Sequence, residues 1–281
     1  MQKLSITFAM FAVLACCATS VTAQQATTAP RTSPPQAKTQ KEFADYNAAY
    51  ATTGGAAVEK AADNFAATYP QSELRSYLYA KAMHDYQNEN NPDKMLAMGN
   101  KVIGLDPDNS VALVLTATLL ADSLADSKDE TLEKDRAQKI AAIQKNATHA
   151  LDAVDGSFTP PQNSTPEQIA AYKSKLRSMA RSALGIMELK NGNDAQAEKD
   201  LQEAASLNKV APDPYIWYHL GLAQDHQRKY AEALASINQA LQYTASNPDL
   251  EKLEKLAKGE RQRLMDLAGP APESPQKPPR Q

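Results

Sequence analysis

The sequence predicts an all-α protein built as an array of antiparallel helix hairpins. Between Thr39 and Ala268 no stretch alternates apolar and polar residues as a strand does, whereas helical spacing recurs throughout. The apolar residues that share one helix face near the C-terminal end are Tyr230, Ala233, Leu234, Ile237, Ala240 and Leu241. Stripes of this kind are separated by short breaks, so we expect about five helix pairs and one C-terminal capping helix.

The breaks carry recognisable capping residues. Thr165 can cap a helix that begins at Pro166, and Gln168 stands at the reciprocal position of a capping box. The preceding helix is expected to end at Asp155-Gly156, before Pro160-Pro161. Glycine accepts the left-handed closing conformation there, and proline cannot continue the helical hydrogen bonding.

One helix pair matches a known packing pattern. Trp217, Leu220 and Gly221 are followed at fixed spacing by three small or aliphatic residues: Ala233, Ile237 and Ala240. This stretch, from 214 to 247, resembles the tetratricopeptide repeat, a helix hairpin of about 34 residues. The resemblance implies that the glycine and the alanines must be small, because the two helices cross closely there. Gln224 departs from the family pattern at a tyrosine, and Ala245 departs from it at a proline.

Weaker copies precede this one. The residues that repeat the pattern are Leu184, Gly185, Ala197, Leu201 and Ala204 in one copy, where Arg181 replaces the aromatic residue, and Tyr79, Tyr86 and Pro107 in another. The resulting repeat domain, 39–268, consists of repeats at 39–72, 76–109, 110–156, 166–211 and 214–247, with a charged insertion at 126–135 and a capping helix at 248–268. The leucines expected to face inward from the capping helix are Leu250, Leu253, Leu256, Leu264 and Leu267.

The resemblance also implies a function. Repeats of this family stack into a right-handed superhelix, and the first helix of each pair lines a concave groove that binds a peptide or a helix of a partner. The residues that this places in the groove are Tyr77, His84, Tyr215, Tyr218, Leu222, Asp225 and His226. Tyr218 is the preferred anchor, although packing between repeats is an equal alternative for the tyrosines. The Lys, Arg and Asn set with which some family members clamp a chaperone C-terminus is missing.

Both ends differ in composition from the repeat domain. Residues 1–23 are typical of an export signal, with Lys3 before an apolar run that is too short to span a bilayer and Val21-Thr22-Ala23 before the expected cleavage site. A competing lipobox pattern ends at Cys16, whose acylation would anchor the chain to a membrane. Residues 24–38 and the proline-rich stretch 269–281 are expected to be disordered, because they bury little apolar surface.

Composition and motifs exclude several functions. Cleavage after Ala23 would remove both cysteines and Lys3, leaving 29 basic against 33 acidic residues, a net charge of -4 with no basic face for nucleic acid. No disulfide, thiolate metal site or transmembrane segment would remain in the mature chain. The usual nucleotide, zinc-protease and serine-hydrolase patterns are absent, and the four histidines never stand at metal-binding spacing. We therefore predict no enzyme activity, cofactor or metal.

The sequence thus indicates a non-catalytic scaffold or adaptor of the bacterial cell envelope, periplasmic or secreted, that binds a protein or peptide. One alternative is an accessory module that recognises a glycan or a cell-wall fragment through exposed aromatic rings. Another is a lipid-anchored protein of outer-membrane assembly, because the stretch 65–72 is similar to a repeat ending of such lipoproteins.

Overall fold

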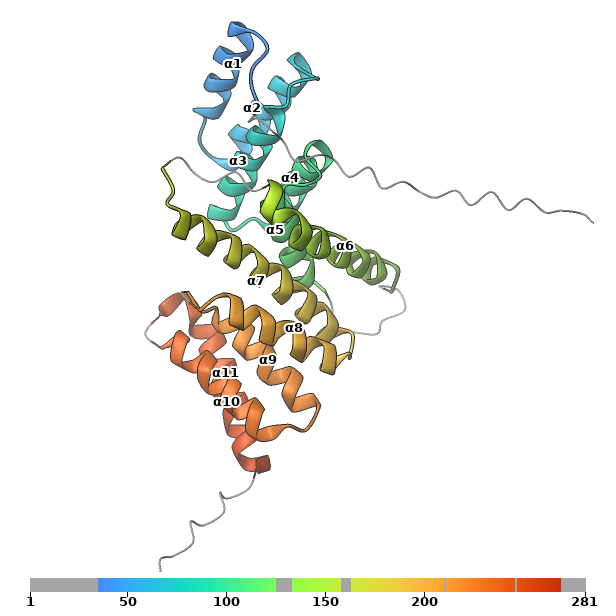
Figure 1. Ribbon diagram of the computed structural model, residues 1–281, viewed down its shortest axis with the longest axis vertical. Coiled ribbons are helices and arrows are strands. Elements are labelled where there is room, and N and C mark those ends of the chain that lie inside the picture. Colours follow the sequence, from blue (N-terminus) through green and yellow to red (C-terminus); the bar gives the residue numbers. More distant parts are fainter. Residues whose placement is uncertain (1–34, 125–132, 158–162, 210, 246, 269–281) are drawn as a thin grey trace, which may run out of the picture. The chain divides into compact units, whose positions relative to one another are not determined.

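The computed structural model describes residues 35–124, 133–157, 163–209, 211–245 and 247–268. Within these ranges the regular structure is entirely helical, and the helices follow one another in chain order (Figure 1). The successive pairs are α1 (Gln40–Tyr50) with α2 (Gly55–Thr68), α3 (Arg75–Asn88) with α4 (Pro92–Leu105), α5 (Ser110–Asp122) with α6 (Glu133–Ser157), α7 (Pro166–Lys190) with α8 (Asp194–Leu207), and α9 (Pro214–His226) with α10 (Tyr230–Thr244). A 3-10 turn, η2 (Pro248–Leu250), leads into α11 (Glu251–Ala268).

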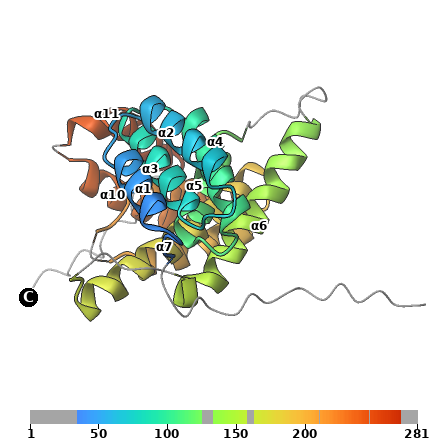
Figure 2. The same ribbon diagram turned by 90° about the horizontal axis from the view of Figure 1, so that it is seen from above.

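Each helix packs against the next one along the chain, and several first helices also touch the first helix of the following pair. Figure 2 shows α1, α2 and α3 lying together in this way. Consecutive packing of helix hairpins is the arrangement of an α-solenoid. The predicted fold class, an all-α array of helix hairpins, is confirmed.

Local capping residues explain where several of the helices begin. Thr165 accepts from the backbone N–H of Gln168 at 3.3 Å, and the Gln168 side chain accepts from the Thr165 N–H at 2.9 Å, which completes the predicted capping box. Asp213 caps α9 in a similar way, accepting from the Tyr215 N–H at 2.9 Å. The helix expected to end at Gly156 continues through Ser157, whose hydroxyl donates to the Ala153 carbonyl.

The buried side chains form two large clusters. One contains residues of α1 to α4 with Ala112 of α5, and it includes the rings of Phe65, Tyr79 and Tyr86. The other contains residues of α5 to α9 and is almost wholly aliphatic. Ile103 and Val111 pack against both clusters, so the core continues from one half of the array into the other.

Small residues stand where the two helices of a pair cross most closely. A Cβ atom on Gly221 of α9 would lie 2.6 Å from Ile237 of α10, and one on Gly185 of α7 would lie 2.6 Å from Leu201 of α8. The pair α3 and α4 reverses this arrangement. There Met83 stands on the first helix and Gly99 on the second, where an added Cβ would lie 2.5 Å from Thr116 of α5 and 3.3 Å from the Met83 sulfur.

Two cationic side chains, Lys190 and Arg136, connect α5, α6 and α7. The Lys190 ammonium donates to the carbonyls of Ala121, Asp122 and Leu124, at 3.2, 3.1 and 2.9 Å, and so caps the C-terminal end of α5. Arg136, near the start of α6, donates in turn to the Lys190 carbonyl at 2.6 Å. The two sides of the α5–α6 connection are therefore both fixed to the end of α7.

The last helix corrects one prediction. Leu253 and Leu264 are buried, together with Ala257, but Leu256 and Leu267 are each 49% exposed. Among the described elements α11 packs chiefly against α10 and less extensively against η2 and α9, so a narrow apolar stripe is enough to cover the packed face.

The sequence of α11 departs from the repeat pattern. Thirty-four residues after Trp217, Leu220, Gly221 and Gln224, the packing positions are occupied by Glu251, Glu254, Lys255 and Lys258. Glu254 and Lys258 form an ion pair at 2.6 Å on the surface of α11. Charged side chains at these positions leave no apolar surface against which a further helix could pack as the second helix of a pair.

Several predictions concern residues outside the described ranges. These are the export signal at 1–23 with its alternative at Cys16, most of the stretch 24–38, most of the insertion at 126–135, and the tail at 269–281. Residues 35–38, which belong to the stretch expected to be disordered, are described and lie against α1 and α3.

Candidate functional site

The predicted groove residues of α9 are divided between solvent and α11. Tyr215 is 45% exposed, whereas Tyr218 packs against the cluster that contains Ala257 and Leu264 of α11. Burial raises the pKa of the Tyr218 hydroxyl. Leu222 is partly buried against the aliphatic core. Packing between repeats, the alternative considered for Tyr218, therefore accounts for much of its surface.

The polar residues of this group are also engaged within the chain. Asp225 forms an ion pair with Arg263 of α11, and His226 Nδ1 lies 2.9 Å from Asp194 of α8. Arg263 also pairs with Glu260 at 2.6 Å. A ligand at this position would have to share Asp225 with α11, so this face is only partly available to a partner.

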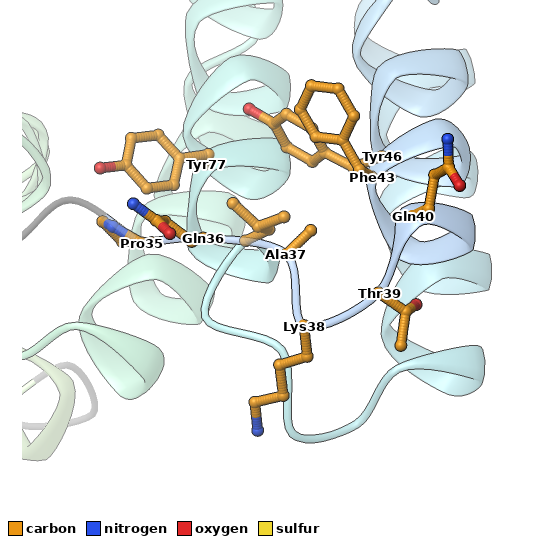
Figure 3. A pocket seen from close by; sticks show the side chains of 10 residues that line it. Pro35, Gln36, Ala37, Lys38, Thr39, Gln40, Phe43, Tyr46 and Tyr77 are labelled. Carbon is orange, nitrogen blue, oxygen red and sulfur yellow. The ribbon is translucent and has the colours of Figure 1, made fainter.

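A more open site lies between α1 and α3. It is a hollow of about 640 Å³ (Figure 3). The residues that line this α1/α3 hollow are Pro35, Gln36, Ala37, Lys38, Thr39, Gln40, Phe43, Tyr46, Leu74 and Tyr77. Tyr77 is the one predicted groove residue among them. His84, the other predicted residue of α3, is exposed and lies one to two turns further along the helix, where its Nδ1 is 3.2 Å from the Asn88 amide.

Aromatic rings of α1 form the opposite wall of the hollow. Phe43 is 56% exposed, and Tyr50, one turn beyond Tyr46, is 48% exposed. Tyr46 is held between them and the core: its ring lies 5.6 Å from that of Tyr50 and 6.2 Å, edge on, from that of Phe65. Burial, with Tyr50 and Tyr77 nearby, raises the pKa of Tyr46 to about 12, so its hydroxyl stays protonated at neutral pH.

Sequence reasoning missed these α1 residues, although a signal for them exists. Phe43 stands 34 residues before Tyr77, and Tyr50 stands 34 residues before His84. A step of one 34-residue repeat therefore marks Phe43 and Tyr50 as the counterparts of the predicted groove residues Tyr77 and His84. The step is hard to recognise in α1, because Asp45 and Ala49 occupy the positions at which the pattern has an aromatic residue and a glycine.

The hollow is closed on one side by residues 35–38, which we call the N-terminal strap. Ala37 packs against the aromatic core, and the Lys38 N–H donates to Glu42 at 2.7 Å. Glu42 is only 3% exposed, and its own N–H donates to the Thr39 hydroxyl at 3.1 Å. This capping arrangement holds the strap where it enters α1.

The charged groups beside the hollow are paired with one another. Lys81 of α3 lies 5.9 Å from the centre of the Tyr50 ring and forms an ion pair with Asp85 at 3.0 Å. Lys41 pairs with Asp45 at 2.6 Å on the exposed side of α1. The hollow is therefore lined by aromatic rings from α1 and α3 and by the polar side chains Gln36, Lys38, Thr39 and Gln40, with ion pairs nearby.

The described residues hold no group of three or more His, Cys, Asp or Glu side chains placed to bind a metal ion. Each histidine has a different neighbour: Asn88 for His84, Asp108 for His149, the Tyr215 carbonyl for His219, and Asp194 for His226. None of the helices in these ranges is both long and apolar enough to cross a bilayer.

Comparison with known proteins adds one structural likeness. No protein-family model matches the chain, and no curated protein matches it. Among solved structures it is similar to a thermophilic TPR protein of Thermus thermophilus, with 14% identity, a TM-score of 0.46, and coverage of 77% of this chain and 98% of that one. The assignment of this chain to the helix-hairpin solenoids follows from its own packing, described above.

Proposed function

We propose that this protein is a non-catalytic interaction scaffold that binds an extended peptide of a partner protein in the α1/α3 hollow. The observation that carries the proposal is the set of aromatic rings left on this surface, with Phe43 56% exposed and Tyr46 and Tyr77 half-buried. Exposed aromatic rings that border a preformed hollow are typical of binding surfaces. They contribute large contact area and lose little conformational freedom on binding.

The α9 surface is proposed as a second contact region for the same partner. Tyr215 and His226 reach solvent there, whereas Tyr218 and Asp225 also support α11. A Tyr218→Ala variant would therefore lose packing as well as any binding contact. Tyr215→Ala and His226→Ala are the cleaner tests of this region, because neither removes a buried side chain.

The exposed rings also favour the second candidate, recognition of a glycan or a cell-wall fragment. A sugar face can stack on an aromatic ring such as Phe43, as a peptide can. The polar lining side chains Gln36 and Gln40 can hydrogen-bond to the backbone of a peptide and to the hydroxyls of a sugar alike, so the two candidates are separated by experiment. Titration with soluble peptidoglycan fragments distinguishes them, because only the glycan candidate expects saturable binding of those fragments.

The place of action proposed is the bacterial cell envelope. It is supported by the export-signal pattern that ends at Val21-Thr22-Ala23. Intact-mass measurement of the exported protein tests it. A mass that begins at Gln24 supports a periplasmic or secreted protein, whereas a lipid mass on Cys16 would make it a membrane-anchored protein.

Binding is tested with full-length protein. A partner identified by crosslinking in envelope extract is divided into overlapping peptides, and the affinity of the binding peptide is measured by fluorescence anisotropy. Phe43→Ala and Tyr77→Ala should each weaken it by about tenfold, which is the effect of losing an aromatic anchor. Tyr172→Ala, a change of another partly exposed tyrosine on α7, serves as the matched control. Equal affinity for all variants, with helicity unchanged by circular dichroism, would remove the hollow from the function.

A further inference from the structure

Helix α1, which forms one wall of the α1/α3 hollow, buries little apolar surface of its own. Glu42 and Ala49 are its buried residues, and neither is a large apolar side chain. Tyr46 supplies the main apolar contact, through the edge-on approach of its ring to Phe65 of α2. A helix with so little buried apolar surface can detach at a lower free-energy cost than the helices of the core.

Hydrogen bonds on the far side of α1 hold it to α2. Tyr69, the C-cap residue of α2, donates from its hydroxyl to the Asp45 carboxylate at 2.6 Å, and Lys41 pairs with the same carboxylate at 2.6 Å. The Lys41 ammonium and the Tyr69 hydroxyl hold the pKa of Asp45 below its usual value, so this group is a carboxylate at neutral pH. Asp45 stands two residues after Phe43, on the opposite side of the helix, and neither Asp45 nor Tyr69 lines the hollow.

The start of α2 is fixed to α3 rather than to α1. The backbone N–H of Gly54 donates to Asp85 of α3 at 3.2 Å, and that of Gly55 donates to Glu89 at 2.7 Å. The connection at residues 51–53 lies between this fixed point and α1. It is therefore the place at which α1 can turn away while α2 and α3 stay together.

The N-terminal strap is joined to α1 more closely than to the rest of the chain. The Lys38 N–H donates to Glu42 of α1 at 2.7 Å, whereas the Lys38 ammonium lies 3.4 Å from the Gln71 carbonyl, which is long for a hydrogen bond. Ala37 packs against the aromatic core with a small side chain. The strap and α1 together face Tyr77 of α3 across the hollow, so the hollow loses two of its sides if they detach (Figure 3).

We propose that α1 and the N-terminal strap open and close as one unit about residues 51–53, and that the α1/α3 hollow is complete only in the closed state. The opening itself is independent of the proposed function, whereas its coupling to a ligand rests on that function. A ligand that touches both walls of the hollow binds the closed state alone and therefore stabilises it.

Hydrogen–deuterium exchange of the full chain at neutral pH measures the opening without any ligand. An isolated helix of 11 residues is not stable in water, so the amides of α1 exchange once it detaches. They should exchange roughly tenfold faster than the amides of α3, or more. Tyr69→Phe keeps the ring and removes one hydrogen bond to α1, and should speed exchange in α1 by about fivefold.

Tyr79→Phe is the matched control. It removes a hydrogen bond of the same kind, from the Tyr79 hydroxyl of α3 to Asp63 of α2 at 2.8 Å, and Asp63 also keeps a lysine partner, Lys101. Because α1 can open without breaking this bond, Tyr79→Phe should speed exchange in α3 and leave exchange in α1 unchanged. Equal acceleration of both helices by Tyr79→Phe, or no effect of Tyr69→Phe on α1, would overturn the proposal.

The ligand step is tested with the partner peptide identified by crosslinking. At about ten times its Kd the peptide should slow exchange in α1 by about tenfold. If α1 opens separately but the peptide does not slow its exchange, the link between opening and the hollow is wrong, although the proposed function survives as long as Phe43→Ala and Tyr77→Ala weaken binding. If those two variants bind the peptide as the wild type does, the proposed function fails while the opening of α1 stands.

Discussion

The second and fifth helix pairs place their glycine on opposite helices of the hairpin. In α9 and α10 the first helix carries the glycine, Gly221, and the second carries the large residue, Ile237. In α3 and α4, at positions with the same spacing, Met83 is the large residue and Gly99 is the glycine. The glycine of a pair therefore need not stand on the first helix, and in the second pair it also makes room for Thr116 of α5, which a Cβ on Gly99 would approach to 2.5 Å.

In both of these pairs a polar side chain of the first helix also hydrogen-bonds to a glutamate of the preceding pair. In the N-terminal half the Tyr86 hydroxyl donates to Glu59 of α2 at 2.5 Å, and Lys94 pairs with Glu59 at 3.0 Å. In the C-terminal half Gln224 takes the place of the tyrosine and donates to Glu198 of α8 at 3.3 Å, and Lys229 pairs with that acid at 2.5 Å.

Gln224 needs one more partner than Tyr86, because its amide oxygen is buried. The Ser236 hydroxyl of α10 donates to that oxygen at 2.7 Å. The departure from the family's tyrosine is therefore matched by a serine twelve residues later in the chain. The hydrogen bond to a glutamate therefore stands at the same position in both halves, but a tyrosine hydroxyl makes it in one and a glutamine amide in the other.

The largest effect is expected for Gly221→Leu. The added side chain would collide with Ile237 at the crossing of α9 and α10, so we expect a loss of about 1 to 3 kcal/mol in the free energy of unfolding. Thermal and denaturant melts followed by circular dichroism measure this loss. A variant as stable as the wild type would show that the crossing lies elsewhere.

A smaller loss of stability is expected when the hydrogen bond between Tyr86 and Glu59 is removed. Tyr86→Phe keeps the ring but removes the hydrogen bond to Glu59, and should destabilise the protein by about 1 to 2 kcal/mol at pH 7. That hydrogen bond, helped by Lys94, holds the pKa of Glu59 below its usual value. Its stabilisation is therefore complete above the unfolded pKa, about 4.3, and is lost as the pH falls through the lower folded pKa.

The difference in stability between wild type and Tyr86→Phe should consequently shrink on acidification from pH 7 to pH 3. Denaturant melts at a series of pH values provide the measurement. A difference that stays constant over this range would mean that the tyrosine stabilises through packing alone.

Exchanging the small and the large residue between α9 and α10 tests whether the glycine can stand on either helix. Gly221→Met should overpack the α9–α10 crossing, and Ile237→Gly should leave a cavity in the core, so each change alone destabilises the protein. Together they should cost about 1 kcal/mol less than the sum of the two single effects, because the methionine can fill part of the space that the isoleucine leaves. A double-mutant cycle on the free energy of unfolding gives this coupling. Strict additivity of the two changes would contradict the idea that the helices can exchange roles.

The smallest effect distinguishes a packed glycine from an exposed one. Gly259 lies inside α11, and a Cβ there would meet no atom within 4 Å. Gly259→Ala should therefore stabilise the protein by about 0.5 to 1 kcal/mol through helix propensity, the opposite sign from Gly221→Leu. Thermal melts of both variants under the same conditions give the comparison.

These features explain how much can be predicted from the sequence. The helices and the fifth pair are readable because amphipathic spacing and the Trp217, Leu220 and Gly221 pattern are local. The reversed crossing at Met83 is not readable, because the pattern assumes a glycine on the first helix. Spacing alone places Leu256 and Leu267 inward, and spacing does not reveal that, among the described elements, α11 packs chiefly against α10.

The candidate site is only partly predictable for a similar reason. Tyr77 is found by its spacing from later repeats, whereas the hollow also needs Phe43 and Tyr46 and the strap beside them. The strap's composition, with proline, glutamine and alanine, resembles that of a disordered linker. Its place against the core depends on contacts with α1 and α3, which no local pattern encodes.

The paired cations at the end of α7 have a consequence for engineering. Lys190 fixes the end of α5 and Arg136 fixes the start of α6, so the chain between them joins two points that are already held. Lengthening such a connection adds only a small entropic term, about 0.6 kcal/mol for each doubling of its length. Residues 125–132 are therefore a suitable place to insert a tag or a second domain, and an inserted glycine-serine segment should leave the melting temperature nearly unchanged unless Lys190 is also replaced.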